Sequence, residues 1–107
     1  MKLSIDTTVT VNIHVKLLDG AKVISTLTES QKFGSQVLLP MIDKILKKNH
    51  LTTANVTSID VNPGPGSFTG TRVGVSVANA MGLALDIPVN GKKGKIVIPI
   101  YEKSNFD

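Results

Sequence analysis

Residues 62–74 read Asn-Pro-Gly-Pro-Gly-Ser-Phe-Thr-Gly-Thr-Arg-Val-Gly, a glycine-rich loop between two regular elements. The run before it, residues 56–61, reads Val-Thr-Ser-Ile-Asp-Val and is predicted to be a strand. The run after it, residues 70–85, repeats apolar and small residues at the spacing of a helix. A strand, a glycine loop and a helix in this order predict a βα unit, in which backbone N–H groups of the loop could face an anion.

The loop does not satisfy the specific phosphate-binding signatures. Gly64, Gly66 and Gly70 give G-x-G-x-x-x-G, one residue longer than the dinucleotide fingerprint, and no lysine follows where a P-loop requires one. Two prolines also remove N–H donors from the loop. We therefore favour a rigid turn that sets the entry angle of the helix, with an anion site as the alternative. Ser67 lacks the G-x-S-x-G elbow of a nucleophile, because position 65 is proline.

Three other polar residues could take part in chemistry. Asp6, which is followed by two threonines, ends a predicted strand and could hold a hydrated magnesium ion or a phosphate, or could close the turn by bonding local backbone. We favour the turn. His14 and His50 are isolated from each other and from any carboxylate cluster, so structural roles are expected for both. The sequence predicts no catalytic residue, no metal site and no cofactor.

Hydrophobic periodicity predicts an α/β domain. An Asp19-Gly20 turn should join the second and third strands of an antiparallel meander, and Pro40 should lie near the first turn of the first helix. The last strand contains Pro99 and is expected at a sheet edge. The resulting order is βββαβαββ, a mixed sheet with two main helices packed on it. Strands are predicted at 2–6, 9–18, 22–28, 56–61, 87–89 and 95–101, and helices at 35–49 and 70–85.

The second predicted helix carries a stripe of small residues spaced by four, namely Gly70, Gly74, Ala78 and Gly82. Each interior glycine costs about 1 kcal/mol relative to alanine, so the stripe indicates that another backbone comes close. The apolar and small positions cover so wide an arc that the helix must be covered on two sides. We infer that the two helices leave a surface for a partner; the alternative is that they cover each other completely. Replacing Gly74 by leucine is predicted to block the partner and leave the monomer folded.

Composition limits the classes of protein to consider. The chain has 107 residues, 41% hydrophobic and 19% charged, as expected for one small folded domain. Cysteine is absent, which excludes a disulfide framework, a cysteine zinc site and a thiol nucleophile. The net charge of +4 is not gathered into a dense patch, and Lys92, Lys93 and Lys95 are interpreted as a solvated loop. No apolar run approaches the roughly 20 residues of a membrane helix, so a cytoplasmic protein is expected.

Residues 62–74 resemble the signature G-x-G-P-G-S-F-T-G-x-R-x-G of the TsaB family, also called YeaZ. Residues 38–43, Leu-Leu-Pro-Met-Ile-Asp, are similar to the family's L-L-P-M-I-D helix, and residues 4–8 are similar to its I-D-T-S/T opening. The matches stand in the family's order and cover roughly the first 90 residues. The matching loop positions are Gly64, Pro65, Gly66, Ser67, Phe68, Thr69, Gly70 and Arg72.

The resemblance implies a ribonuclease H-like lobe of the actin-like ATPase superfamily. It implies a non-catalytic subunit that binds the transferase TsaD during synthesis of threonylcarbamoyladenosine in tRNAs reading codons that begin with A. The ATPase TsaE would join the complex, tRNA would be touched at most indirectly, and a homodimer through the two helices is also implied. The alternatives are a nucleotide-binding lobe of a phosphotransferase or hydrolase, and a self-associating protein without the modification role. The implied partner or dimer surface comprises Val37, Leu38, Met41, Ile45, Gly70, Gly74, Val77, Ala78 and Met81.

The chain departs from the family pattern in two ways. The usual second lobe does not follow residues 87–89, and residues 98–103 weakly resemble the family's C-terminal P-x-Y-x-R. We therefore expect a single lobe over residues 1–107 with a short C-terminal strand or tail at about 92–107, derived by internal deletion. Nucleotide in this superfamily lies between two lobes, and the first glycine of the signature is Asn62 here. Both departures count against nucleotide binding.

Overall fold

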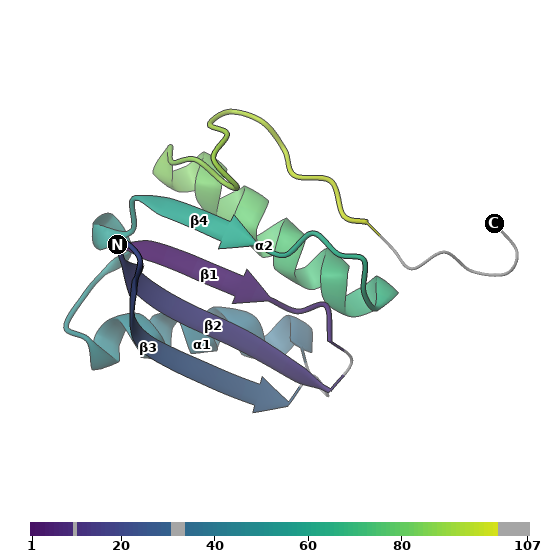
Figure 1. Cartoon of the computed structure of the whole chain (residues 1–107), viewed down its shortest axis with the longest axis horizontal. Helices are drawn as coiled ribbons and strands as arrows, with labels where there is room; N and C mark the ends of the chain where they lie inside the picture. The colour runs from purple at the N-terminus through teal and green to yellow at the C-terminus, as the bar shows by residue number, and fades with distance from the viewer. Residues whose placement is uncertain (10, 31–33, 101–107) are drawn as a thin grey trace, which may run out of the picture.

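The computed structural model describes residues 1–9, 11–30 and 34–100, and its centre is a four-stranded mixed sheet (Figure 1). The strands are β1 (Lys2–Asp6), β2 (Asn12–Asp19), β3 (Lys22–Ser30) and β4 (Ser58–Val61), in the spatial order β3-β2-β1-β4. β1 pairs antiparallel with β2, and β2 pairs antiparallel with β3, which confirms the predicted meander. β4 pairs parallel with β1, which makes the sheet mixed.

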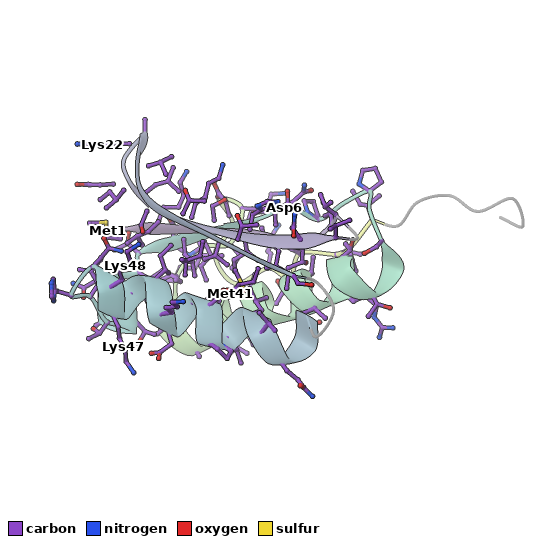
Figure 2. All side chains as sticks on the ribbon, turned by 90° about the horizontal axis from the view of Figure 1, so that it is seen from below. Met1, Asp6, Lys22, Met41, Lys47 and Lys48 are labelled. Atoms are coloured by element: carbon purple, nitrogen blue, oxygen red, sulfur yellow. The ribbon has the colours of Figure 1, made fainter. Side chains whose placement is uncertain are left out.

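Two long helices, α1 (Gly34–Lys48) and α2 (Phe68–Leu85), lie on the same face of the sheet. Figure 2 shows both of them beneath the sheet, so the domain has two layers. A single 3-10 turn, η2 (Thr53–Asn55), lies between α1 and β4. Both helices were predicted, each within two residues of its observed start. No helix among the described residues is long and apolar enough to cross a membrane.

The core lies between the sheet and the helices and follows the period of each element. Strand residues at alternate positions point into it, and so does one stripe of each helix. The alternation predicted for 9–18 holds only from Ile13 onward, because Val9 and Val11 precede β2 and are exposed. The buried apolar residues are Leu3, Ile5, Ile13, Val15, Leu17, Leu38, Met41, Ile42, Ile45, Leu46, Val56, Ile59, Val61, Val75, Ala78 and Val89.

Pro40 lies inside α1 rather than near its first turn. Proline has no N–H, so the carbonyl of Gln36, four residues earlier, receives no helical hydrogen bond from it. Pro40 and Gln36 are both exposed, so water can solvate that carbonyl. The apolar stripe on the opposite side, which includes Leu38 and Ile45, keeps the helix packed on the sheet.

The two strands predicted after α2 do not form in the described residues. Val89 makes one parallel bridge with Ile59 of β4 and one antiparallel bridge with Lys92. Left-handed backbone at Asn90, Gly91 and Gly94 then turns the chain away before a ladder can extend. Residues 95–100 belong to no sheet, and Tyr101 lies outside the described residues. The predicted order βββαβαββ is therefore wrong for its last two strands and confirmed for the rest.

Beyond the bridge at Ile59, the edge of β4 is covered by a side chain. The Val61 N–H donates to Oδ1 of Asn90 at 2.8 Å, and Asn90 Nδ2 donates to the Val61 carbonyl at 2.9 Å. The amide thus makes the two bonds that a neighbouring strand would make at this residue. The outer backbone edge of β4 at Val61 is thus satisfied without a fifth strand.

Candidate functional site

The first candidate site lies where β1 and β4 end side by side. Parallel neighbours end at the same edge of a sheet, which brings Asp6 next to Asn62 at the start of the glycine loop. Oδ1 of Asp6 accepts hydrogen bonds from the Thr8 N–H at 3.0 Å and the Thr8 hydroxyl at 2.7 Å. Oδ2 accepts one from Nδ2 of Asn62 at 3.2 Å. These bonds agree with the favoured interpretation of Asp6 as a turn residue, because its carboxylate bonds the residues that follow its own strand.

The same contacts keep Asp6 ionised. Partial burial by itself would raise the pKa of this carboxyl, but hydrogen bonds from Thr8 and Asn62 and the nearby His14 outweigh burial and lower the pKa below its usual value. The ring of His14 has its own partner, with Nδ1 3.0 Å from the Thr28 hydroxyl. Asp6 is therefore a hydrogen-bond acceptor engaged on both oxygens, not a carboxyl adjusted to exchange a proton near neutral pH.

The glycine loop lies directly against the chain's own backbone. The Ser67 N–H donates to the Thr8 carbonyl at 3.0 Å. A Cβ added to Gly66 would lie 2.5 Å from Cβ of Thr8, and a Cβ added to Gly64 would overlap the Ile100 carbonyl. The space that these glycines provide is thus occupied by residues 8 and 100 of the same chain. The geometry agrees with the rigid turn that was favoured over an anion cradle.

The stripe of small residues on α2 is also used inside the chain, which corrects the inference that it makes room for a partner. The Gly74 N–H donates to the Thr7 hydroxyl at 3.1 Å, and that hydroxyl donates to the Gly70 carbonyl. A Cβ at Gly74 would overlap the same hydroxyl oxygen, and a Cβ at Gly82 would overlap a methyl of Val89. The Gly74→Leu prediction is therefore wrong in its second half: leucine there would disrupt the fold and not merely block a partner.

The nine residues predicted for a partner surface fall into two groups. Those buried in this chain are Leu38, Met41, Ile45, Gly70, Gly74 and Ala78, and those half-buried are Val37, Val77 and Met81. The buried side chains pack under the sheet and present no surface to a partner, since α1 and α2 each have one stripe in the core. Only the half-buried group remains as candidate contacts.

The helices do not cover each other completely, because a groove lies where α1 and the residues that follow it meet Met81 of α2. This helix-pair groove has a volume of about 430 Å³. Leu39, which is 56% exposed, stands at its rim and was missed from the sequence. Leu39 is an apolar residue that lies outside the core stripe of α1, beside Asp43 on the solvent side. This unusual position was the signal that the sequence offered for a contact surface. The residues lining the groove are Leu39, Ile42, Asp43, Leu46, Lys47, Leu51, Thr52, Thr53 and Met81.

A second hollow, of about 380 Å³, lies on the N-terminal half of α2. Two signature residues, Thr69 and Arg72, line it together with Val73, Ser76 and Val77. Of the other signature positions, Gly70 is buried, Pro65 is exposed, and Gly64, Gly66 and Ser67 are half-buried. Phe68 begins α2, and its side chain lies outside the described part. The signature therefore has a structural half in the loop and an accessible half on the helix.

Comparisons with known proteins agree with this architecture. A family model described as TsaD, tRNA N6-adenosine threonylcarbamoyltransferase, matches residues 23–91, more than half of the chain. The chain is 36% identical over 86 residues to the tRNA threonylcarbamoyladenosine biosynthesis protein TsaB of Buchnera aphidicola subsp. Baizongia pistaciae, covering 80% of this chain and 38% of the relative. The TsaB protein of Bacillus subtilis is 33% identical over 89 residues, covering 82% of this chain and 38% of the relative.

The solved structures include a similar fold. YeaZ from Pseudomonas aeruginosa superposes with a TM-score of 0.75 at 30% identity, covering 82% of this chain and 41% of that chain. The chain thus spans about two-fifths of the length of these relatives. The predicted α/β lobe and the predicted resemblance are both confirmed. The chain belongs to the TsaB (YeaZ) family, within the wider family that the TsaD model describes.

Proposed function

We propose that the chain is a non-catalytic subunit that binds the transferase TsaD in the synthesis of threonylcarbamoyladenosine in tRNA. The names of the TsaB relatives support a role in this pathway. The modified tRNAs would be those reading codons that begin with A, and TsaE would join through the complex. Contact with tRNA would be at most indirect, and the role would place the chain in the cytoplasm.

The contacts of Asp6 and of the glycine loop support a subunit that does not itself catalyse the reaction. Both oxygens of Asp6 accept bonds from within the chain, and the glycines of the loop pack on Thr8 and Ile100. A nucleotide or phosphate at this edge would have to displace those internal contacts. The groups that resemble a phosphate site are instead engaged in holding β1, the loop and α2 together.

The helix-pair groove is the observation that carries the proposal. It combines an exposed leucine at the rim, half-buried Met81 on its floor and a charged edge at Asp43 and Lys47. Protein interfaces have this composition, an apolar centre within a polar rim. Leu39 could insert into an apolar pocket of TsaD while Met81 adapts to its shape. The half-buried Val77, one turn before Met81, extends the same surface along α2, whereas Val37 lies on the other flank of α1, away from the groove.

Co-purification with TsaD of the same organism tests this proposal. The wild-type chain should elute with TsaD at micromolar concentration in gel filtration. Leu39→Lys, which places a charge at the rim of the groove, should weaken binding at least tenfold without loss of folding. Ile98→Lys is the matched control, because Ile98 is also an exposed apolar residue and does not line the groove, and it should bind normally.

Three results would count against the proposal. If the wild-type chain forms no complex with TsaD, the proposal is wrong. If the two lysine variants weaken binding equally, the groove is not the binding site. Saturable binding of magnesium ATP in calorimetry, abolished by Asp6→Ala, would favour the nucleotide-binding alternative.

A further inference from the structure

A third hollow, which we call the C-terminal hollow, lies between the last two turns of α2 and the segment that follows the helix. It has a volume of about 370 Å³. The chain after α2 folds back alongside the helix (Figure 1), so residues 79–86 form one wall and residues 92–96 form the other. The residues that carry the argument are Leu83, Asp86, Val89, Lys92, Lys95 and Ile96.

The two walls of the C-terminal hollow are joined by specific contacts. The Asn79 side chain bonds the Val97 backbone twice: Nδ2 donates to the carbonyl, and the Val97 N–H donates to Oδ1, both at 2.9 Å. The Lys93 ammonium lies 3.2 Å from the Asp86 carboxylate, which ties the loop to the end of α2. The hollow is therefore formed in the free chain, and a preformed site loses less conformational entropy on binding than one that must first be ordered.

The surface of the hollow is largely apolar. Val89 forms part of the floor and is buried against Gly82. Leu83 and Ile96 stand on opposite walls and are 85% and 78% exposed. Among the described residues, Leu83 is the most exposed large apolar side chain. Filling this hollow with an apolar group would remove both side chains from water, which is favourable.

Two lysines border this apolar surface and add positive charge to it. None of the ion pairs among residues 1–9, 11–30 and 34–100 includes Lys92 or Lys95. The carboxylate of Asp86, which also lines the hollow, is already paired with Lys93. The hollow therefore combines an apolar centre with positive charge that no described carboxylate neutralises. This combination favours an apolar ligand that carries negative charge.

We propose that the C-terminal hollow binds a short acidic peptide segment of a partner protein. One aliphatic or aromatic side chain of the segment would fill the hollow, and neighbouring glutamates or aspartates would face Lys92 and Lys95. A volume of about 370 Å³ is near the lower end of ligand pockets, so it suits one or two side chains and not a folded element. Anchors that insert into a pocket in this way supply most of the binding energy at protein interfaces.

Two other anionic partners fit the hollow less well. RNA would contact the lysines through its phosphates, but its bases stack on aromatic side chains, and the described residues that line the hollow include none. An anionic membrane would also attract the lysines, but a flat lipid surface would touch the rim at Leu83 and Ile96 and leave the floor unfilled. An acidic peptide uses both the charge and the depth of the hollow.

The C-terminal hollow lies on the side of α2 opposite to the helix-pair groove. Leu83 is two positions from Met81, which lines the groove, so the two side chains leave the helix about 160° apart. The inference therefore goes beyond the proposed function and uses a different surface. A negative result for one of them leaves the other intact.

Tryptophan fluorescence with synthetic peptides tests the proposal. The chain contains no tryptophan, so a tryptophan in the peptide reports binding without an added label. The probe is a short peptide with a central tryptophan and glutamates on both sides. Its emission should shift to the blue as the full chain is added, with a dissociation constant of order 100 µM, because the contact is far smaller than a standard interface. Added salt should weaken binding, since exposed charges are screened. A control peptide with lysines in place of the glutamates should bind at least fivefold more weakly.

Variants of the chain locate the binding site. Lys95→Glu should weaken binding of the glutamate probe at least fivefold. Lys44→Glu is the matched control, because Lys44 is an exposed lysine on α1 outside the hollow and the net charge changes equally; it should bind normally. Leu83→Ser, which removes the apolar rim, should also weaken binding and reduce the blue shift. Lys95 and Leu83 are exposed, so both variants should melt at the wild-type temperature.

Four results would overturn the proposal. They are the absence of binding to the wild-type chain, equal binding of the glutamate and lysine probes, equal effects of Lys95→Glu and Lys44→Glu, and full binding by Leu83→Ser. Oligouridine or phosphatidylserine vesicles, tested in the same buffer, should bind more weakly than the glutamate probe. Tighter binding of either one, lost in Lys95→Glu, would assign the lysines to RNA or to a lipid surface instead.

Discussion

Gly74→Ala tests whether α2 is fixed to β1 through the Thr7 hydroxyl. The new Cβ would overlap that oxygen and lie 3.2 Å from Cγ2 of the same side chain, which is fully buried. Thr7 would have to move, with loss of its bonds to Gly74 and Gly70. Two hydrogen bonds at about 1 kcal/mol each and about 1–2 kcal/mol of overpacking oppose the gain of about 1 kcal/mol in helix propensity. The net expectation is a loss of about 2–3 kcal/mol.

Urea denaturation measures this loss directly. With a slope of about 2 kcal/mol/M for a domain of this size, the midpoint should fall by about 1 M or slightly more. Ala80→Gly on the exposed face of α2 is the control. It measures the loss of helix propensity that glycine causes at a position exposed to solvent. Combining Gly74→Ala with Thr7→Ala should recover at least about 1 kcal/mol relative to the sum of the single changes, because the overlap disappears. An unchanged or higher midpoint for Gly74→Ala would refute the reasoning.

Three further predictions concern single side chains. Thr71→Val should leave the protein as stable as wild type or up to about 1 kcal/mol more stable in thermal melting, because the buried Thr71 hydroxyl has no hydrogen-bond partner among residues 1–9, 11–30 and 34–100. Asp6→Asn should be less stable than wild type at pH 7. That difference should shrink as the pH falls below about 4, because the lowered pKa of Asp6 stabilises the folded state only while the carboxyl is ionised. Asn79→Ala should speed amide hydrogen exchange at Val97 at least tenfold and leave exchange in β1 unchanged, since the Val97 N–H donates its hydrogen bond to the Asn79 side chain.

Much of the fold follows from local patterns in the sequence. Alternation from Ile13 to Leu17 and the turn at Asp19-Gly20 locate β2 and β3, and helical spacing locates α1 and α2. These patterns are reliable because one face of each element is buried against the other layer. The segment from Ile96 to Ile100 has equally strand-like residues but forms no strand, because pairing depends on a neighbour that no local pattern reveals.

The candidate site was less predictable, for the same reason. The spacing of Gly74 and Gly82 correctly indicated a close approach, but the approaching groups are Thr7 and Val89 of this chain. The spacing of residues in the sequence locates the stripe of small residues on the helix, but it does not show which group packs against that stripe. Likewise Met41 and Ala78 are apolar and at the right spacing for an interface, yet the sheet already buries them. Which of two apolar faces remains open is decided by the layer arrangement.

Titration of fluorescently labelled chain with TsaD of the same organism tests the central claim most directly. The account predicts a saturable one-to-one isotherm, weakened at least tenfold by Leu39→Lys and unchanged by Ile98→Lys. A flat isotherm with correctly folded wild-type chain, or identical isotherms for the wild type and Leu39→Lys, would contradict it.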